Sequence, residues 1–211
     1  MGRTVYWMNV SLDLFIEGGS GRDGDWGWLR IGEELHREFN RRAANLTAMV
    51  QGRVVYEIME GSWPGIATDP SMPDYMQEYG KIWTDIPKVL VSRSRTEAGY
   101  NTRVLGGPDA IGRLATLRAT TDGDIGVGGA NLATQLHEAG LLDELLLFTH
   151  PALLGTGRPL FDRIDRPIEL DLLERAGFER GVTMHRYAVT SRTTQGQSAP
   201  KSRPPGGPPI S

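Results

Sequence analysis

Short apolar runs alternate with segments of helical periodicity along most of the chain, a pattern typical of a sheet covered by helices. The apolar runs predict strands at 5–10, 46–51, 88–92, 125–128 and 143–149. Apolar spacing predicts helices at about 31–44, 75–83, 109–117 and from 132 onward, with a helical turn at 54–59. Two further runs, 168–176 and 182–189, predict a closing antiparallel pair. The stretch 62–71 holds Pro64 and Pro70, so we expect a loop there.

This order of elements predicts one α/β domain over residues 1–190, with a mixed, mostly parallel central sheet flanked by helices and antiparallel C-terminal strands. Residues 18–27 are predicted to form a glycine-rich loop after the first strand. Residues 191–211 are rich in Pro, Gly and Ser and have almost no apolar side chains. Because such a segment buries too little surface to offset the entropy of ordering, we expect a disordered tail.

Composition and charge narrow the classes of function. Residues 1–190 carry 20 basic and 26 acidic side chains without a basic stripe, which argues against nucleic acid as a partner. No apolar run approaches the roughly 20 residues of a membrane span, and the N-terminus lacks a signal-peptide layout. We therefore expect a cytoplasmic protein without a membrane partner. The chain has no cysteine, and its four histidines lack metal-ligand spacing, so no metal site is predicted.

One segment suggests phosphate binding on its own residues. The apolar run that starts at Ile125 ends in Gly128 and Gly129, and a helical pattern follows from Leu132. A strand that ends in two glycines and opens a helix lets a ligand approach bare backbone N–H groups at the positive end of the helix dipole. The alternative is that the two glycines only form a tight turn.

The order of the motifs resembles the dihydrofolate reductase superfamily, and most closely the reductase domain of riboflavin-biosynthesis deaminase-reductases in a stand-alone form. The resemblance covers residues 4–190 and rests on five segments in the family's order. These segments are 11–16 (SLDLFI), 52–57 (GRVVYE), 89–93 (VLVSR), 128–132 (GGANL) and 151–161 (PALLGTGRPLF). The resemblance implies a dihydrofolate-reductase-like three-layer fold. The spacing of a Rossmann fingerprint is absent, and no deaminase motif is present.

The resemblance also implies that NADPH binds across the carboxyl edge of the sheet. The implied cofactor residues are Ile16, Gly52, Arg53, Val54, Ser92, Arg93, Gly128, Gly129, Ala130, Asn131 and Leu132. Ile16 would border the nicotinamide, Arg53 would pair with a phosphate, and Arg93 would favour NADPH over NADH through the 2′-phosphate. The alternatives are that Ile16 is only a core residue, that Arg53 is a solvated arginine at a helix start, and that Arg93 lies in an exposed turn.

The substrate side of the site is less determined. Asp13 and Glu34 are candidate proton donors, and the resemblance supports each through a different branch of the superfamily. The alternatives are that Asp13 only caps a loop and that Glu34 only stabilises the helix dipole. Trp26, with its neighbour Trp28, is a candidate for stacking on a flat ring, or else staples the loop. Thr149 matches a pocket threonine of the family, and the alternative is a threonine placed at a strand end by β-propensity alone.

Together these features predict an NADPH-dependent oxidoreductase that transfers hydride to a small heterocyclic or carbonyl- or imine-bearing substrate, pterin-like or ribosylamino-pyrimidine-like. Leu14 and Val54 depart from the family's usual residues and weaken the inference of a specific substrate. A protein that binds NADPH or a heterocycle without catalysis, as a sensor or sequestering protein, is the alternative. The resemblance further implies a homodimer.

Overall fold

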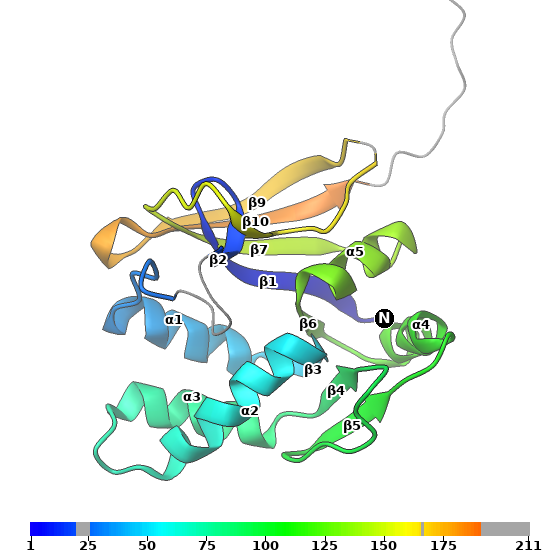
Figure 1. Cartoon of the computed structure of the whole chain (residues 1–211), viewed down its shortest axis with the longest axis horizontal. Helices are drawn as coiled ribbons and strands as arrows, with labels where there is room; N and C mark the ends of the chain where they lie inside the picture. Colours follow the sequence, from blue (N-terminus) through cyan, green and yellow to red (C-terminus); the bar gives the residue numbers. More distant parts are fainter. Residues whose placement is uncertain (20–25, 166, 191–211) are drawn as a thin grey trace, which may run out of the picture.

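The computed structural model describes residues 1–19, 26–165 and 167–190. Its centre is an eight-stranded sheet with the order β5-β4-β3-β6-β1-β7-β10-β9 (Figure 1). The sheet strands are β1 (Arg3–Ser11), β3 (Leu46–Gly52), β4 (Lys88–Val91), β5 (Thr102–Leu105), β6 (Asp124–Gly128), β7 (Glu144–His150), β9 (Glu169–Gly177) and β10 (Thr183–Thr190). The helices are α1 (Glu33–Ala44), α2 (Arg53–Thr68), α3 (Asp74–Asp85), α4 (Ala110–Thr120) and α5 (Ala130–Glu138), with a short 3₁₀ turn at Glu179–Gly181.

The pairing of the strands confirms the predicted fold class. Strand β1 lies parallel to both β6 and β7, and β3 lies parallel to both β4 and β6. Strand β10 pairs antiparallel with β7 on one side and with β9 on the other. The sheet is therefore mostly parallel, with antiparallel strands at the C-terminal end of the chain.

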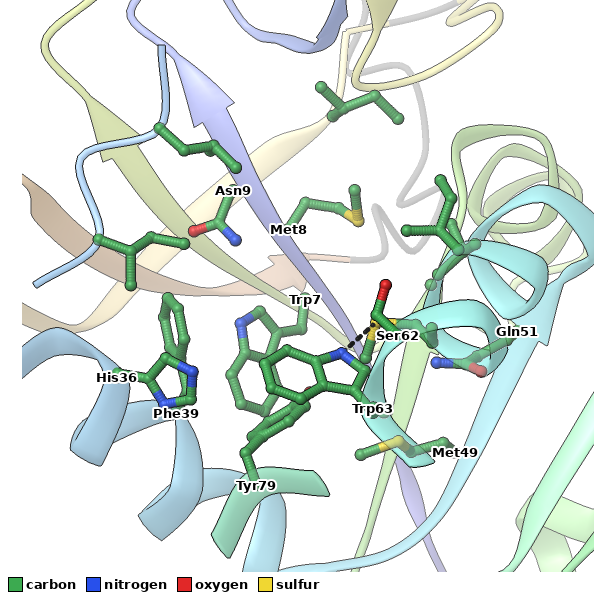
Figure 2. Close-up of a pocket in the computed structure, with 18 of the residues that line it drawn as sticks. Trp7, Met8, Asn9, His36, Phe39, Met49, Gln51, Ser62, Trp63 and Tyr79 are labelled. Atoms are coloured by element: carbon green, nitrogen blue, oxygen red, sulfur yellow. Dashed lines mark hydrogen bonds between the residues drawn. The ribbon is translucent and has the colours of Figure 1, made fainter. Parts of the chain in front are cut away.

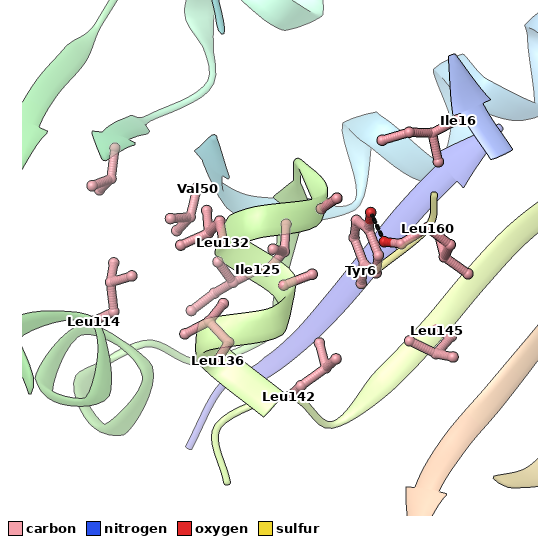
Figure 3. Packing of buried hydrophobic residues seen from close by; sticks show 14 of the residues in the cluster. Tyr6, Ile16, Val50, Leu114, Ile125, Leu132, Leu136, Leu142, Leu145 and Leu160 are labelled. Atoms are coloured by element: carbon pink, nitrogen blue, oxygen red, sulfur yellow. Dashed lines mark hydrogen bonds between the residues drawn. The ribbon is translucent and has the colours of Figure 1, made fainter. Parts of the chain in front are cut away.

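Helices cover both faces of the sheet and form two hydrophobic cores. Helices α4 and α5 pack on one face, where Leu132 and Leu136 lie among strand residues such as Ile125 (Figure 3). At the edge of this core the Tyr6 hydroxyl donates a hydrogen bond to the Leu160 carbonyl oxygen, 2.8 Å away. Helices α1, α2 and α3 cover the opposite face, so the three layers predicted from the sequence are present.

The prediction of a loop over 62–71 is wrong for residues 62–68, because α2 continues through Pro64 to Thr68, and only residues 69–71 lie outside the helix. Proline removes one backbone donor from the helix, but this part of α2 packs closely on α3. At Gly80 a Cβ atom would lie only 2.7 Å from the Trp63 carbonyl oxygen and 2.9 Å from the Ala67 Cα atom. We infer that this close helix–helix contact stabilises the segment more than the lost hydrogen bond weakens it.

Three short strands escaped the sequence pattern. Strand β5 has four residues, and β2 (Phe15–Gly18) and β8 (Gly157–Pro159) form a separate two-stranded ribbon. Such lengths are too short to show a period of two. Most of the predicted glycine-rich loop (20–25) and the predicted tail (191–211) lie outside the described residues. Within the described ranges, no helix has the length and apolarity to cross a membrane, and no cluster of three or more His, Asp or Glu could hold a metal ion.

Candidate cofactor and substrate site

Two glycine motifs that are far apart in the sequence meet at the carboxyl edge of the sheet. Gly52 ends β3 and Gly128 ends the neighbouring β6, with Gln51 in register with Gly128. Helix α2 begins directly after the first motif and α5 after the second. A Cβ atom on Gly52 would lie 3.7 Å from the Gly128 carbonyl oxygen, and one on Gly129 would lie 3.8 Å from the Gly52 nitrogen. The two helix N-termini therefore lie side by side.

The backbone at this junction is bare. Gly129 has φ 109° and ψ 130°, a conformation that L side chains rarely adopt. A Cβ atom on Gly128 would meet Val55 Cγ1 at 3.1 Å. Neither α2 nor α5 has a side-chain cap at its start, so the first N–H groups of both helices remain available to an anion. We call the backbone of Gly52, Gly128 and Gly129 the glycine cradle.

The glycine cradle has the shape and the backbone donors needed to bind a dinucleotide. Its glycines leave room for phosphate oxygens beside backbone donors, and a side chain at any of them would narrow that room. The Gln51 Oε1 atom, in the residue before Gly52, is buried without a hydrogen-bond partner in the described part of the chain. An orphan acceptor at this edge is consistent with a ligand that supplies a donor. The residues present therefore fit a nicotinamide dinucleotide.

The arginines predicted near the cofactor lie at the same edge but differ in their partners. Arg53 is half exposed and pairs with Glu57 of its own helix at 2.7 Å. Arg93 is exposed and, within the residues described, has no ion-pair partner. Ser92 is buried, and its hydroxyl accepts N–H groups of the following turn, including that of Arg95 at 2.9 Å. Arg95 itself is held by Glu60 at 2.6 Å. Of the two arginines in the turn after β4, Arg93 is thus the one whose guanidinium forms no ion pair with a described residue.

Next to the cradle lies a cavity of about 520 Å³ between the sheet edge and helices α1, α2 and α3 (Figure 2). Gly128 of the cradle lines it, and so do Ile16 and Trp26 of the segment before α1. Ten of its 24 lining residues carry aromatic or thioether side chains. These are Trp7, Trp26, Phe39, Trp63, Tyr75 and Tyr79, together with Met8, Met49, Met59 and Met76. Such a wall suits a flat, apolar ring.

The remaining predicted cofactor residues lie on α2 and α5. Ala130 and Leu132 are buried in the first turn of α5, which directly follows Gly129 of the cradle. Asn131 is exposed beside them, and its side-chain amide donates a hydrogen bond to Asp162 at 2.9 Å. Val54 is 53% exposed at the start of α2, an unusual setting for a valine. Both helix starts therefore carry an exposed residue, Val54 on α2 and Asn131 on α5.

Two predicted substrate-side residues lie outside the cavity wall. Glu34 is exposed on the first turn of α1, and the residues of this helix that line the cavity are His36 and Phe39. Thr149 is half-buried on β7 and is not among the lining residues. Trp28 is buried against His150, with ring centroids 5.5 Å apart. Of the predicted substrate-binding residues, only Trp26 lines the cavity.

Asp13 caps the loop that contains Leu154 and Gly155. Its carboxylate accepts hydrogen bonds from the Ser11 hydroxyl at 2.6 Å and from the backbone N–H groups of Leu154 and Gly155 at 3.1 and 2.8 Å. The bond from Ser11, helped by these N–H groups, lowers the pKa of Asp13 to about 2. Asp13 is therefore ionised at neutral pH, which favours the loop-capping alternative over proton donation from this side chain.

The sequence analysis missed two buried histidines at the site. His36 lines the cavity, and burial lowers its pKa. His150 accepts the Arg30 backbone N–H at its Nδ1 atom and donates from Nε2 to Asn9 Oδ1, at 2.9 and 3.0 Å. Burial, together with the charge of Arg30, lowers the pKa of His150 to about 4. His150 thus orients Asn9, which lines the cavity. For His36 a signal existed, since a histidine on the apolar face of a helix is unusual.

Comparisons with known proteins show a shared fold. The chain is 27% identical over 186 residues to the uncharacterized protein YyaP of Bacillus subtilis (strain 168), covering 88% of this chain and 94% of that protein. A pyrimidine reductase-like protein from Corynebacterium diphtheriae has a similar structure, with a TM-score of 0.62, 13% identity and coverage of 90% and 92%. A dihydrofolate reductase from Enterococcus faecalis complexed with NADP(H) aligns with a TM-score of 0.57, 12% identity and coverage of 90% and 98%.

The family assignment rests on the sequence itself. Residues 5–184 match the family described as RibD C-terminal domain, which takes in both glycine motifs and the strands that carry them. Membership of this family supports an oxidoreductase of the riboflavin-pathway reductase kind. The chain belongs to the RibD C-terminal domain family.

Proposed function

We propose that this protein is an NADPH-dependent reductase that acts on a small heterocyclic or carbonyl- or imine-bearing substrate. The observation that carries the proposal is the glycine cradle, which opens directly beside an apolar cavity lined by aromatic side chains. The family match and the likeness in fold to an NADP(H) complex support it.

The residues of this chain would divide the work as follows. The N–H groups at the starts of α2 and α5 would hold the pyrophosphate, and Ile16 would border the nicotinamide. When bound, the nicotinamide would supply a hydride to an electrophilic carbon of the substrate. The apolar wall would exclude water and hold the substrate ring against it. Within the described residues no carboxylate lines the cavity, so we assign proton supply to water rather than to Glu34.

The choice between NADPH and NADH gives the first prediction. Arg93 is exposed after β4 and is the arginine proposed to pair with the 2′-phosphate. We expect Arg93→Ala to weaken NADPH binding by about tenfold or more, the size expected for a charge-assisted hydrogen bond, and to leave NADH binding unchanged. Titration of both cofactors, followed by nicotinamide fluorescence, measures the preference.

Arg103→Ala is the matched control, because Arg103 is also an exposed arginine but lies on the neighbouring strand β5. It should keep the preference of the unaltered protein. Equal losses for NADPH and NADH in Arg93→Ala would show that the residue does not read the 2′-phosphate.

A binding protein without catalysis remains the competing function, and the lack of a carboxylate in the described cavity wall favours it. The two functions differ in turnover. A reductase oxidises NADPH in the presence of a suitable conjugated carbonyl or imine acceptor, whereas a sensor or sequestering protein binds NADPH or the heterocycle and oxidises nothing. A screen of acceptors against NADPH absorbance separates them.

We also propose that two copies associate through strand β9. This strand forms one edge of the main sheet, and its residues are exposed apart from Ala176. Leu170, Leu172 and Leu173 are 38%, 53% and 53% exposed, which is unusual for leucines on an unpaired strand edge. An apolar edge strand is a ready template for pairing with a second chain.

For this interface we expect Leu172→Glu to convert a dimer into a monomer in light scattering, since a buried charge opposes association. Leu153→Glu is the control, because Leu153 is even more exposed (73%) but lies in a loop outside β9. A monomer for the unaltered protein, or a dimer that survives Leu172→Glu, would contradict the proposed interface.

A further inference from the structure

The end of the cavity where α1, α2 and α3 meet is an aromatic cage around one histidine. The ring centroid of His36 lies 5.7 Å from that of Trp63, 5.1 Å from that of Tyr75 and 5.7 Å from that of Tyr79. His36 is only 6% exposed, and Figure 2 shows it among Phe39, Trp63 and Tyr79. The imidazole is therefore a polar group fixed inside an apolar wall.

The hydrogen bonds around His36 determine which nitrogen faces a ligand. The Asn40 side-chain nitrogen donates to the Tyr75 carbonyl oxygen at 2.8 Å and to Glu78 Oε2 at 2.6 Å. The Asn40 amide oxygen must then be the acceptor of its 3.2 Å contact with His36 Nδ1. Nδ1 consequently carries the hydrogen. In the neutral ring, Nε2 is a lone-pair acceptor, and no described residue donates to it.

Burial keeps the ring neutral. Desolvation lowers the pKa of His36, and Arg37 on the same helix acts in the same direction. The hydrogen bond to Asn40 and the charge of Glu78 act against it but are the smaller effects. Arg37 is itself turned to the surface, where it pairs with Glu33 and Asp74. At neutral pH His36 thus offers an acceptor and no charge.

The rest of the described wall is also uncharged. None of the lining residues is Asp, Glu, Lys or Arg. A phosphate or carboxylate group inside this cavity would lose its hydration without gaining a counter-charge, which is strongly unfavourable. The aromatic faces and methionine sulfurs instead favour flat, conjugated rings. The wall selects against charged ligands and for neutral aromatic ones.

From these observations, and resting on the proposed reductase function, we propose that the substrate is an uncharged, flat, conjugated molecule with an N–H or O–H group that donates a hydrogen bond to His36 Nε2. A substrate that inserts a phosphate or carboxylate into the cavity is excluded by the same wall. His36 is then a specificity-determining residue, because its Nε2 is the acceptor held inside the aromatic cage.

Three probes with one ring system test this proposal. 2-Naphthol is neutral and has a donor, 2-methoxynaphthalene is neutral without a donor, and 2-naphthyl phosphate is charged. Calorimetric titration without NADPH should show binding of 2-naphthol, about tenfold weaker binding of 2-methoxynaphthalene for the loss of one hydrogen bond, and no binding of 2-naphthyl phosphate. Binding of the phosphate as tight as that of 2-naphthol overturns the proposal, as does equal binding of the two neutral probes.

A variant locates the acceptor. His36→Phe keeps an aromatic ring but removes Nε2, so it should reduce 2-naphthol binding to the level of 2-methoxynaphthalene and leave the latter unchanged. His185→Phe, a histidine of β10 outside the cavity wall, should bind both probes as the unaltered protein does. Retention of the preference in His36→Phe overturns the role of His36. The three probes on the unaltered protein decide the substrate class even where the variant does not fold.

These results are separable from the test of the reductase function. The probe titrations contain no cofactor, so their outcome does not depend on NADPH. Failure of NADPH to bind, with the expected order of the probes, rejects the reductase and leaves the neutral-ligand selectivity standing. Binding of NADPH together with tight binding of 2-naphthyl phosphate supports the reductase and rejects the neutral-ligand selectivity.

Discussion

Replacing Gly129 with alanine is expected to weaken NADPH binding by about 2 kcal/mol, roughly thirtyfold, because the cradle backbone must move. Gly129 has φ 109° and ψ 130°, outside the regions open to alanine. The added Cβ itself meets no atom closer than 3.6 Å, so steric overlap inside the protein is not the cause. Rotation of the backbone toward an allowed conformation would turn the N–H groups at the start of α5 away from the phosphates. Fluorescence titration with NADPH measures the loss.

Gly140→Ala is the matched control for this variant. Gly140 also has a positive φ, 67°, but it follows the other end of α5, where a Cβ atom would meet open space. Its replacement should lower stability by about 1 kcal/mol through backbone strain and leave NADPH binding unchanged. Unaltered NADPH affinity in Gly129→Ala would mean that the cofactor does not use the cradle.

The second large effect concerns stability in acid. The pKa of His150 is about 4 in the folded protein and about 6.5 in the unfolded chain. Between these values the unfolded chain binds the proton and the folded protein does not, so stability is complete above pH 6.5 and falls as the pH decreases toward 4. The shift corresponds to about 3 kcal/mol of unfolding free energy. Burial lowers the pKa of His36 as well, so that residue acts in the same direction.

A glutamine in place of His150 removes the titrating group and retains one donor and one acceptor for Asn9 and Arg30. We expect His150→Gln to lose much less stability than the unaltered protein between pH 6.5 and 4.5. Denaturant unfolding of both proteins at several pH values measures the difference. If the two proteins lose stability in parallel over this range, His150 is not the buried group that titrates.

Much of the fold could be predicted because the parallel strands other than β5 are largely apolar runs between turn signals. The sequence also indicated the cradle, since glycines at 52 and 128–129 each stand where a strand ends and a helix starts. What the sequence could not show is that these strands are neighbours. Their adjacency comes from the pairing of β3 with β6, a contact between segments about 75 residues apart.

The errors have different physical origins. Residues 62–68 of the expected loop are helical because close packing of α2 on Gly80 outweighs the proline, a tertiary effect that local propensity does not contain. Glu34 lies on α1 but does not line the cavity, because one helical position turns a side chain by about 100° and the face of α1 toward the cavity carries His36 and Phe39. Its catalytic role stays a prediction. Motifs that occur in the same order as in a family therefore predict the position of a helix better than they predict which of its residues faces the ligand.

In the proposed function, a nicotinamide held by the glycine cradle enters the apolar cavity. Trp7, Trp26 and Trp63 all line that cavity, so a nicotinamide inside it lies close to three indole rings. The most direct measurement is a titration with NADPH that follows energy transfer from tryptophan to the nicotinamide. We expect saturable transfer with a dissociation constant in the micromolar range and much weaker binding of NADH. The absence of binding below millimolar NADPH, or binding without energy transfer, would contradict the claim.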